Sequence, residues 1–211
     1  MYIRRVPAAL AAALTLAMLL IAGCGGQDEA SAPPSASDPQ RGFLSAMVPH
    51  HTSAVDMAQV AQQEAQSDFV KGLANDIVSS QTAEIEQMGS IHERLFKAPL
   101  EPDMGGHMAL GLSAEEAGMG HMGGADMIRG KQPFDRLFVE QMIPHHQGAI
   151  RMAEAVQGKT RDPALRQLAT EIVTAQRREI KEMNEFRARE FGGPVPGSPP
   201  PAAAPGGGQS G

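Results

Sequence analysis

An internal repeat restricts the fold of this chain more than any other feature of its sequence. A shift of 95 residues, made without a gap, superposes Phe43, Met47, Pro49, His50, His51, Ala54, Met57 and Ala58 on Phe138, Met142, Pro144, His145, His146, Ala149, Met152 and Ala153. The same shift superposes Leu73, Ala74, Ile77, Val78, Gln81, Glu84, Ile85 and Met88 on Leu168, Ala169, Ile172, Val173, Gln176, Glu179, Ile180 and Met183. Such self-similarity indicates a duplicated structural unit.

Each copy of the unit predicts two helices. Apolar side chains recur at steps of three and four residues in both halves of a copy, which is the periodicity of an amphipathic helix. Capping residues and prolines indicate helix starts at Asp38-Pro39, at Ser67 or Asp68, and at Asp162-Pro163. Stop signals follow in Phe96-Lys97-Ala98-Pro99 and Phe191-Gly192-Gly193-Pro194. Short connections make the two helices of a copy antiparallel neighbours.

Two such hairpins predict an all-α fold, a four-helix bundle of the ferritin-like kind, because each hairpin can bury its apolar stripe against the other. We expect one folded domain over residues 39–188. Its first repeat spans 39–96, its second spans 133–190, and a long connector rich in Met, His and Gly spans 97–132. Such a long connection is typical of a functional or disordered segment.

A proline stands just before each histidine pair. Pro49 and Pro144 lie well inside the first helix of their repeats if these helices begin at the predicted caps. Each proline then removes one helical hydrogen bond from the carbonyl four residues earlier, that of Ser45 or Glu140, and should kink the helix. The alternative is that each helix begins at its proline.

The two ends of the chain are predicted to lie outside this domain. Residues 1–23 carry a basic start, a short apolar run and the ending Ala22-Gly23 before Cys24, as in a lipoprotein signal peptide. Cys24 is then the lipidated first residue of the mature protein, held at the bacterial cell envelope; the alternative is an ordinary signal peptide with Cys24 a bystander. Residues 24–38 read as a flexible tether, and residues 191–211 as a disordered Pro/Gly/Ala tail.

Charge and cysteine content limit the partners and the kinds of metal site that the protein can have. Removing residues 1–23 leaves 16 basic and 24 acidic side chains, a formal charge of −8, which disfavours nucleic acid as a partner. A single cysteine excludes an intramolecular disulfide and a multi-thiolate metal site. The protein is expected to cross the bacterial inner membrane and to stay anchored, facing the periplasm or the exterior.

Potential metal ligands are duplicated on the helix faces expected to be buried. They are His50, His51, Met47, Met57, Glu84 and Met88 in the first repeat, and His145, His146, Met142, Met152, Glu179 and Met183 in the second. A buried carboxylate needs a proton, a histidine or a metal ion, and the histidines of the first helix are the nearest partners. The alternative is a metal-free His-Glu network that fixes the bundle register, with methionine as adaptable core filler.

Ligand softness indicates which metal such sites would take. Met47 and His50, like Met142 and His145, are three residues apart and therefore share one helical face. Thioether with imidazole suits Cu(I), and by extension Ag(I), better than iron, magnesium or calcium. The Glu-x-x-His pattern of di-iron bundles is absent from the sequence.

The connector supplies a second set of soft ligands: Met104, His107, Met108, Met119, His121, Met122 and Met127. It holds five of the eleven methionines that follow the signal peptide, in a glycine-rich context that predicts neither a helix nor an apolar face. We therefore expect secondary metal sites there. A short helix opening at the capping box Ser113-Ala-Glu-Glu116 is predicted to divide the connector; the alternative is a disordered linker.

The stretch Phe134-Asp-Arg-Leu-Phe-Val-Glu-Gln-Met-Ile-Pro-His-His-Gln-Gly-Ala-Ile-Arg-Met152-Ala, with Gln176-x-x-Glu179-Ile-x-x-Met183, resembles the bacterial family called domain of unknown function 305. The resemblance covers about residues 39–188. It implies a ferritin-like fold and, since some members bind copper in the periplasm, a copper role. The family motif positions here are His50, His51, Met57, Glu84, Met88, His145, His146, Met152, Glu179 and Met183.

The sequence thus favours a non-enzymatic binder of Cu(I), or of Ag(I), that sequesters the ion or hands it to copper-handling proteins. Two alternatives remain open at this point. One is a ferritin-like redox enzyme using His50, His145, Glu84 and Glu179 around iron or copper; the other is a metal-free structural module. Whether the sites form in one bundle or across a homo-oligomer is equally open.

Overall fold

The computed structural model describes residues 38–192 of the chain. The predicted signal peptide, Cys24, nearly all of the tether and the tail from residue 193 lie outside the described residues. Within residues 38–192, no helix combines the length and the apolar character needed to cross a bilayer.

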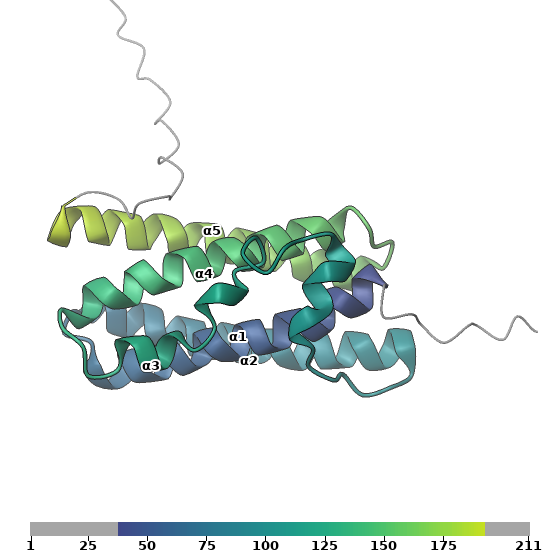
Figure 1. Cartoon of the computed structure of the whole chain (residues 1–211), viewed down its shortest axis with the longest axis horizontal. Coiled ribbons are helices and arrows are strands. Elements are labelled where there is room, and N and C mark those ends of the chain that lie inside the picture. Colours follow the sequence, from purple (N-terminus) through teal and green to yellow (C-terminus); the bar gives the residue numbers. More distant parts are fainter. Residues whose placement is uncertain (1–37, 193–211) are drawn as a thin grey trace, which may run out of the picture. The chain divides into compact units, whose positions relative to one another are not determined.

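The described residues form a helical bundle without β-strands, as predicted (Figure 1). Its elements are α1 (Pro39–Glu64), α2 (Asp68–Phe96), the 3-10 helices η1 (Met104–Leu110) and η2 (Met119–His121), α3 (Gly124–Ile128), α4 (Phe134–Gln157) and α5 (Pro163–Phe191). Helix α1 packs on α2 and α4 on α5, and the two hairpins meet mainly through α1 and α4. The long helices are therefore the two predicted hairpins, and α5 continues one residue into the segment predicted as tail.

The predicted capping residues begin three of the four long helices, α1, α2 and α5, whereas α4 begins after Pro133 without a side-chain cap. Asp38 accepts hydrogen bonds from the backbone N–H groups of Gln40 and Arg41, at 2.8 and 3.2 Å. Ser67 and Asp162 each accept one bond from a backbone N–H three residues later. These bonds satisfy amides that have no partner inside the helix.

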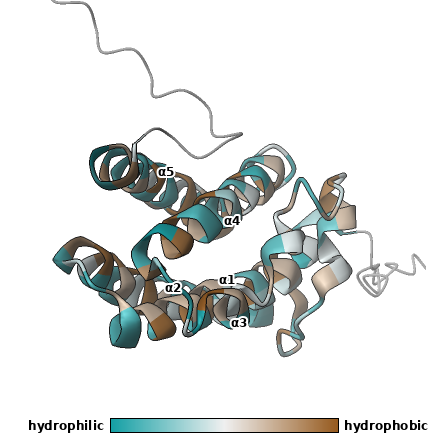
Figure 2. Cartoon of the chain, turned by 60° about the vertical axis from the view of Figure 1, so that its left-hand side comes forward, coloured by the Kyte–Doolittle hydropathy of each residue, from teal (hydrophilic) through white to brown (hydrophobic). Residues whose placement is uncertain are grey.

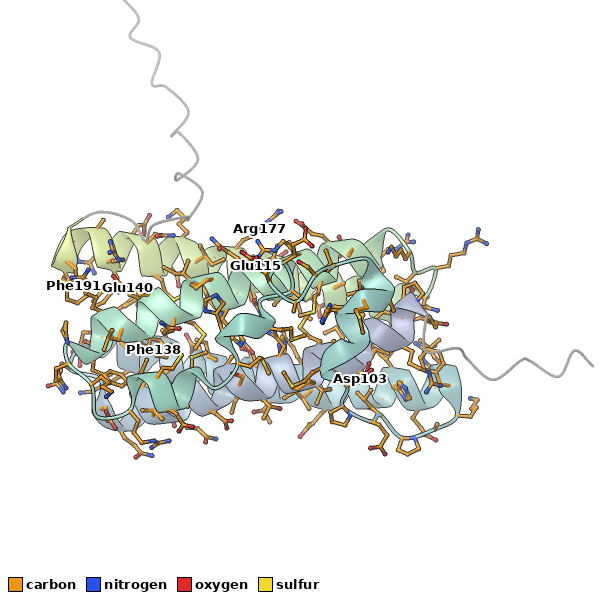
Figure 3. The ribbon with its side chains drawn as sticks, viewed as in Figure 1. Asp103, Glu115, Phe138, Glu140, Arg177 and Phe191 are labelled. Atoms are coloured by element: carbon orange, nitrogen blue, oxygen red, sulfur yellow. The ribbon has the colours of Figure 1, made fainter. Side chains whose placement is uncertain are left out.

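Two apolar clusters fill the bundle, one toward each end. One holds Phe134, Phe138 and Ile77, and the other holds Phe43, Leu44 and Leu168. Figure 2 shows the apolar colouring gathered on the helix surfaces that face one another. Figure 3 labels Phe138 on α4 and Asp103 in the connector, in opposite halves of the bundle. Since each cluster takes side chains from both repeats, neither hairpin buries its apolar stripe alone.

Pro49 and Pro144 lie inside continuous helices, α1 and α4. The alternative in which each helix begins at its proline is therefore wrong. The structure also shows where one freed carbonyl finds its partner. The Ser45 carbonyl, which Pro49 cannot serve, accepts a hydrogen bond of 2.9 Å from the backbone N–H of Asp103. The Ser45 carbonyl is thus an attachment point for the connector on α1.

The connector is folded onto the bundle, which contradicts the reading of it as a disordered linker. It runs across the faces of α1 and α4 (Figure 1), and Leu110, Ala117, Met119 and Ile128 are buried. The glycines allow this packing. A Cβ on Gly42 of α1 would lie 2.5 Å from the Gly106 carbonyl oxygen. Helix η1 can therefore approach α1 this closely only because both positions are glycine. The expectation that the connector lacks an apolar face is therefore wrong.

The short helix predicted at Ser113 does not form, although its capping box does. Ser113 Oγ accepts from the Glu116 N–H at 3.2 Å, and Glu116 accepts from the Ser113 N–H at 2.8 Å. The chain makes only turns from Ala114 to Gly118, because Gly118 adopts a left-handed conformation (φ 73°). A helix cannot continue through that conformation.

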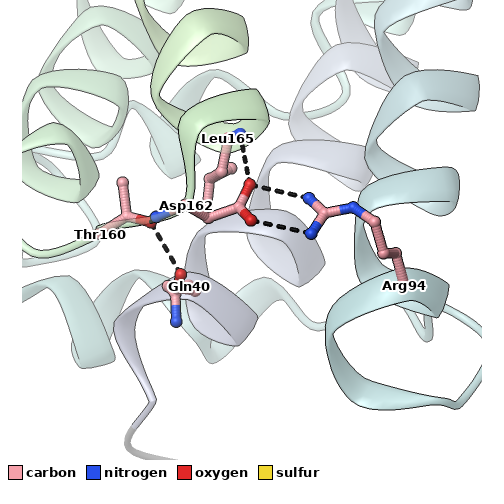
Figure 4. A network of polar contacts seen from close by, with 5 residues as sticks. All are labelled: Gln40, Arg94, Thr160, Asp162 and Leu165. Carbon is pink, nitrogen blue, oxygen red and sulfur yellow. Dashed lines mark hydrogen bonds and ion pairs between the residues drawn. The ribbon is translucent and has the colours of Figure 1, made fainter.

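Polar contacts join the two hairpins at the start of α5 (Figure 4). Arg94 of α2 donates two hydrogen bonds of 2.8 Å to the Asp162 carboxylate, and Thr160 Oγ1 donates one of 2.7 Å to Gln40 of α1. The repeat equivalent of Gln40 is Asp135, which accepts the backbone N–H groups of Gln66 and Ser67 at the opposite end. The duplicated contact holds the hairpins in one mutual register.

Candidate metal site

Each hairpin contains one histidine bonded to one glutamate. His51 Nε2 lies 2.7 Å from Glu84 Oε2, joining α1 to α2, and His146 Nε2 lies 2.7 Å from Glu179 Oε2, joining α4 to α5. A carboxylate accepts, so each Nε2–H donates, and in the neutral ring Nδ1 carries the lone pair. Both Nδ1 atoms are buried without a hydrogen-bond partner among the described residues. The second member of each His-His pair is thus held by its carboxylate with Nδ1 free.

The first histidines of the two pairs meet each other between the hairpins. The rings of His50 and His145 are 3.9 Å apart, centroid to centroid, and are tilted by 43°. None of their four ring nitrogens makes a well-formed hydrogen bond within residues 38–192, and only the Ala117 backbone lies close enough to His50 for a weak one. The predicted four histidines therefore form one cluster across the repeat interface, with two rings in direct contact.

Burial keeps the two central rings neutral. His50 and His145 are 0% and 1% exposed. Desolvation lowers the pKa of His50 well below 6.5, and the nearby imidazoles of His51, His146 and His121 lower it further; the Ala117 backbone opposes this weakly. Desolvation, followed by His50, His146, His51 and His121, also lowers the pKa of His145. A neutral imidazole with an unused lone pair is a metal ligand in its binding form.

Buried methionines flank this cluster on both sides. All six predicted helix methionines are 0% exposed. They divide between the two apolar clusters as Met57, Met142 and Met183 in one and Met47, Met88 and Met152 in the other. Each cluster thus takes methionines from both repeats, in the pattern that the duplication requires. Thioether sulfur is available in both halves of the bundle.

The structure places the seven predicted connector ligands in different surroundings, four of them at least partly buried and three exposed. Met119 is buried among Met47, Met88 and Met152, and Met122 packs against the same cluster. His121 lies close enough to influence the pKa of His50 and His145. His107 is buried, and its Nδ1 is hydrogen-bonded at 2.8 Å to the Leu112 carbonyl.

The remaining three, Met104, Met108 and Met127, are 52%, 70% and 55% exposed. Their side chains are therefore largely in solvent and do not enter either apolar cluster.

The two glutamates lie apart from the contact between His50 and His145. Nowhere in residues 38–192 do three side chains drawn from His, Cys, Asp and Glu converge to hold a metal ion. The set expected for the redox alternative is also divided, because Glu84 and Glu179 bond to His51 and His146 while His50 contacts His145. The two glutamates occupy the positions of groups that orient histidine ligands.

Sequence reasoning missed the glycines that cover the cluster. A Cβ on Gly118 would lie 3.2 Å from His50 Nε2, and a Cβ on Gly148 would lie 2.5 Å from both the Ala117 oxygen and the Gly118 Cα. The connector backbone therefore rests directly on His50 and on α4. One signal was present in the sequence: Gly148 stands within a helix one turn after a histidine pair, where glycine weakens the helix.

Burial of the neutral rings predicts that the metal-free protein loses stability in mild acid. Below about pH 6.5 the unfolded chain binds protons at His50 and His145 that the folded state, with its lowered pKa values, does not bind. The free energy of unfolding should then fall with pH, by up to about 1.4 kcal/mol per pH unit for each histidine. Urea unfolding of metal-free protein between about pH 7.5 and 5 measures this. A His50→Leu/His145→Leu variant should show a shallower slope, and equal slopes would contradict the prediction.

Fold and site together define a duplicated helical bundle with paired imidazoles buried between its hairpins and buried thioethers in both apolar clusters. The sequence matches the family described as domain of unknown function (DUF305) over residues 40–187, and the chain belongs to that family.

Solved structures are similar along almost their whole length. CopM in its Cu(I)-bound form is 32% identical with a TM-score of 0.61, and the match covers 72% of this chain and 98% of CopM. A DUF305 fragment from Deinococcus radiodurans is 31% identical with a TM-score of 0.58, covering 74% and 99%.

A sequence relative is the uncharacterized protein L153 of Acanthamoeba polyphaga mimivirus, 46% identical over 52 residues. That match covers 25% of this chain and spans about a third (34%) of the relative.

Proposed function

We propose that this protein binds a soft monovalent metal ion, Cu(I) and by extension Ag(I), and sequesters it or hands it on. One observation carries the proposal: His50 and His145 are buried, neutral and in ring contact, and none of their ring nitrogens makes a well-formed hydrogen bond among the described residues. Burying polar atoms without partners costs free energy. A metal ion between the two rings would offset that cost.

The donor set favours a soft ion with few ligands. Two imidazoles satisfy a low coordination number, and Met47 and Met142 lie one helical turn before His50 and His145 on the same faces. Thioether and neutral imidazole are ligands that Cu(I) prefers. The similarity to CopM, which has been solved in Cu(I)-, Cu(II)- and Ag-bound forms, supports a copper-handling role.

The His-Glu pairs have an orienting role in this proposal. Glu84 and Glu179 fix the rotation and the tautomer of His51 and His146, which leaves each Nδ1 lone pair for the ion. The role is one of binding and not of catalysis. The two glutamates contact the histidine ligands and do not bind the ion themselves. Copper-handling proteins in the same compartment supply or receive the ion.

The proposal also assigns a cellular location to the protein, on the basis of its N-terminal sequence. Lipid on Cys24 holds the protein at the cell envelope, on the periplasmic or the extracellular side. A Cys24→Ser variant should appear in the soluble fraction of the producing cells while the unaltered protein stays with the membranes. An unaltered protein found in the soluble fraction would contradict the anchor and leave the metal site untouched.

A Cu(I) titration against a chromophoric competitor tests the function. We expect sub-micromolar binding that changes little near pH 6.5 and weakens only at lower pH, because burial lowers the pKa of His50 and His145 well below 6.5 and only protonated imidazole cannot ligate. Fe(II) and Zn(II) should not displace the bound ion. Binding of Cu(I) that is only micromolar or weaker, or equal affinity for Zn(II), would overturn the proposal.

A further inference from the structure

A groove lies between α1 and the connector, beside the histidine pair of the first repeat. Its volume is about 350 Å³, and it is lined by Val48, Pro49, Thr52, Ser53, Asp56, Pro102, Met122, Gly123 and Ala125. Pro49 directly precedes His50, and Thr52 directly follows His51. The floor of the groove is therefore the same stretch of α1 that carries the two histidines.

The connector forms the opposite wall of the groove and is fastened to its floor. The Gly123 N–H donates a hydrogen bond of 3.3 Å to Ser53 Oγ. Met122, immediately before Gly123, both lines the groove and packs against the apolar cluster that contains Met47, Met88 and Met152. One thioether thus borders the open groove on one side and the buried cluster on the other.

A metal ion in solvent can reach the buried histidines His50 and His145 only through residues that line a path from the surface. His50 and His145 are 0% and 1% exposed, and the backbone of Ala117 and Gly118 covers them where the connector meets Gly148. His121, next to Met122 in the chain, is partly exposed and lies near enough to act on the pKa of both buried rings. The thioether that lines the groove and a half-buried imidazole near the buried pair are therefore consecutive residues of η2 and its C-terminal end.

We propose that Met122 and His121 form a relay through which the metal ion enters and leaves the buried site. The ion binds the Met122 sulfur in the groove, exchanges this ligand for the His121 imidazole, and then exchanges that for the His50 and His145 imidazoles. Binding at Met122 displaces one ligand that the incoming ion carries, and the second step exchanges the sulfur for one imidazole. The last step forms two metal-imidazole bonds while the bond to His121 breaks, and the ion stays monovalent throughout. The inference rests on the proposed function, which it deepens by assigning a route to the same site.

The relay predicts a change in rate without a change in affinity. In the purified full-length protein, Met122→Leu should slow loading of Ag(I) at least tenfold in stopped-flow measurements. Release to a competing ligand should slow by the same factor, so that the equilibrium affinity stays within about twofold. Leucine keeps the volume of the side chain and should leave the fold intact. Met104→Leu is the matched control, because Met104 is 52% exposed and does not line the groove.

A second variant tests the groove without removing sulfur. Ala125→Leu adds bulk at the lining while Met122 and His121 remain, and should slow loading as well. Unchanged loading rates in both variants, with affinity intact, would overturn the relay and leave the proposed function standing. An unaltered protein that takes up no Ag(I) or Cu(I) at all would overturn the proposed function, and the relay with it. A Met104→Leu variant as slow as Met122→Leu would also overturn the relay.

Discussion

Replacing His50 and His145 together by leucine is expected to weaken Cu(I) binding by on the order of a hundredfold or more. The change removes the two rings whose nitrogens make no well-formed hydrogen bond in the described part of the chain. Removing both members of a buried polar contact in favour of apolar groups is close to neutral for stability. The folded variant can therefore be titrated under the same conditions, and competitor titration gives the ratio of the two affinities.

The glutamates provide the matched comparison. A Glu84→Gln/Glu179→Gln variant keeps the shape of the site but weakens the control over His51 and His146. It should lose about tenfold to a hundredfold in affinity and keep the same number of bound ions. A leucine variant that binds as tightly as the unaltered protein would show that the central rings are structural. A glutamine variant that loses an ion entirely would show that the carboxylates are themselves ligands.

Replacing Gly148 by alanine is expected to destabilise the fold by about 1 to 3 kcal/mol, because overpacking forces the backbone to shift. The new Cβ would meet the Ala117 oxygen and the Gly118 Cα at 2.5 Å, and both are backbone atoms that no side-chain rotation can move away. The connector would have to lift from α4. Chemical denaturation of the metal-free protein measures the change.

Gly89 gives the control for that experiment, since it too lies inside a long helix, α2, but has nothing within 4 Å of an added Cβ. Gly89→Ala should therefore stabilise the protein by about 0.5 to 1 kcal/mol through helix propensity alone. Equal effects of the two changes would contradict the account in which Gly148 exists to let the connector approach.

The sequence by itself determined the scaffold, because the signals for it are local or repeated. Capping residues such as Asp38 and Asp162 act on amides within three positions, and the 95-residue shift implies two like hairpins that must bury their apolar stripes together. The same reasoning found every histidine, methionine and glutamate now near the centre. It also correctly named the first-helix histidines as the partners of the two glutamates.

Only the tertiary structure decided which of these groups meet. Helical periodicity places His50 and His51 beside one stripe but cannot tell which one turns to Glu84 and which to His145, since that depends on how the helices rotate and cross. The glycine-rich connector was misread for a similar reason. Gly106 and Gly148 allow close backbone approach between segments far apart in the chain, and a glycine inside a helix can signal such an approach but cannot identify the segment that makes it.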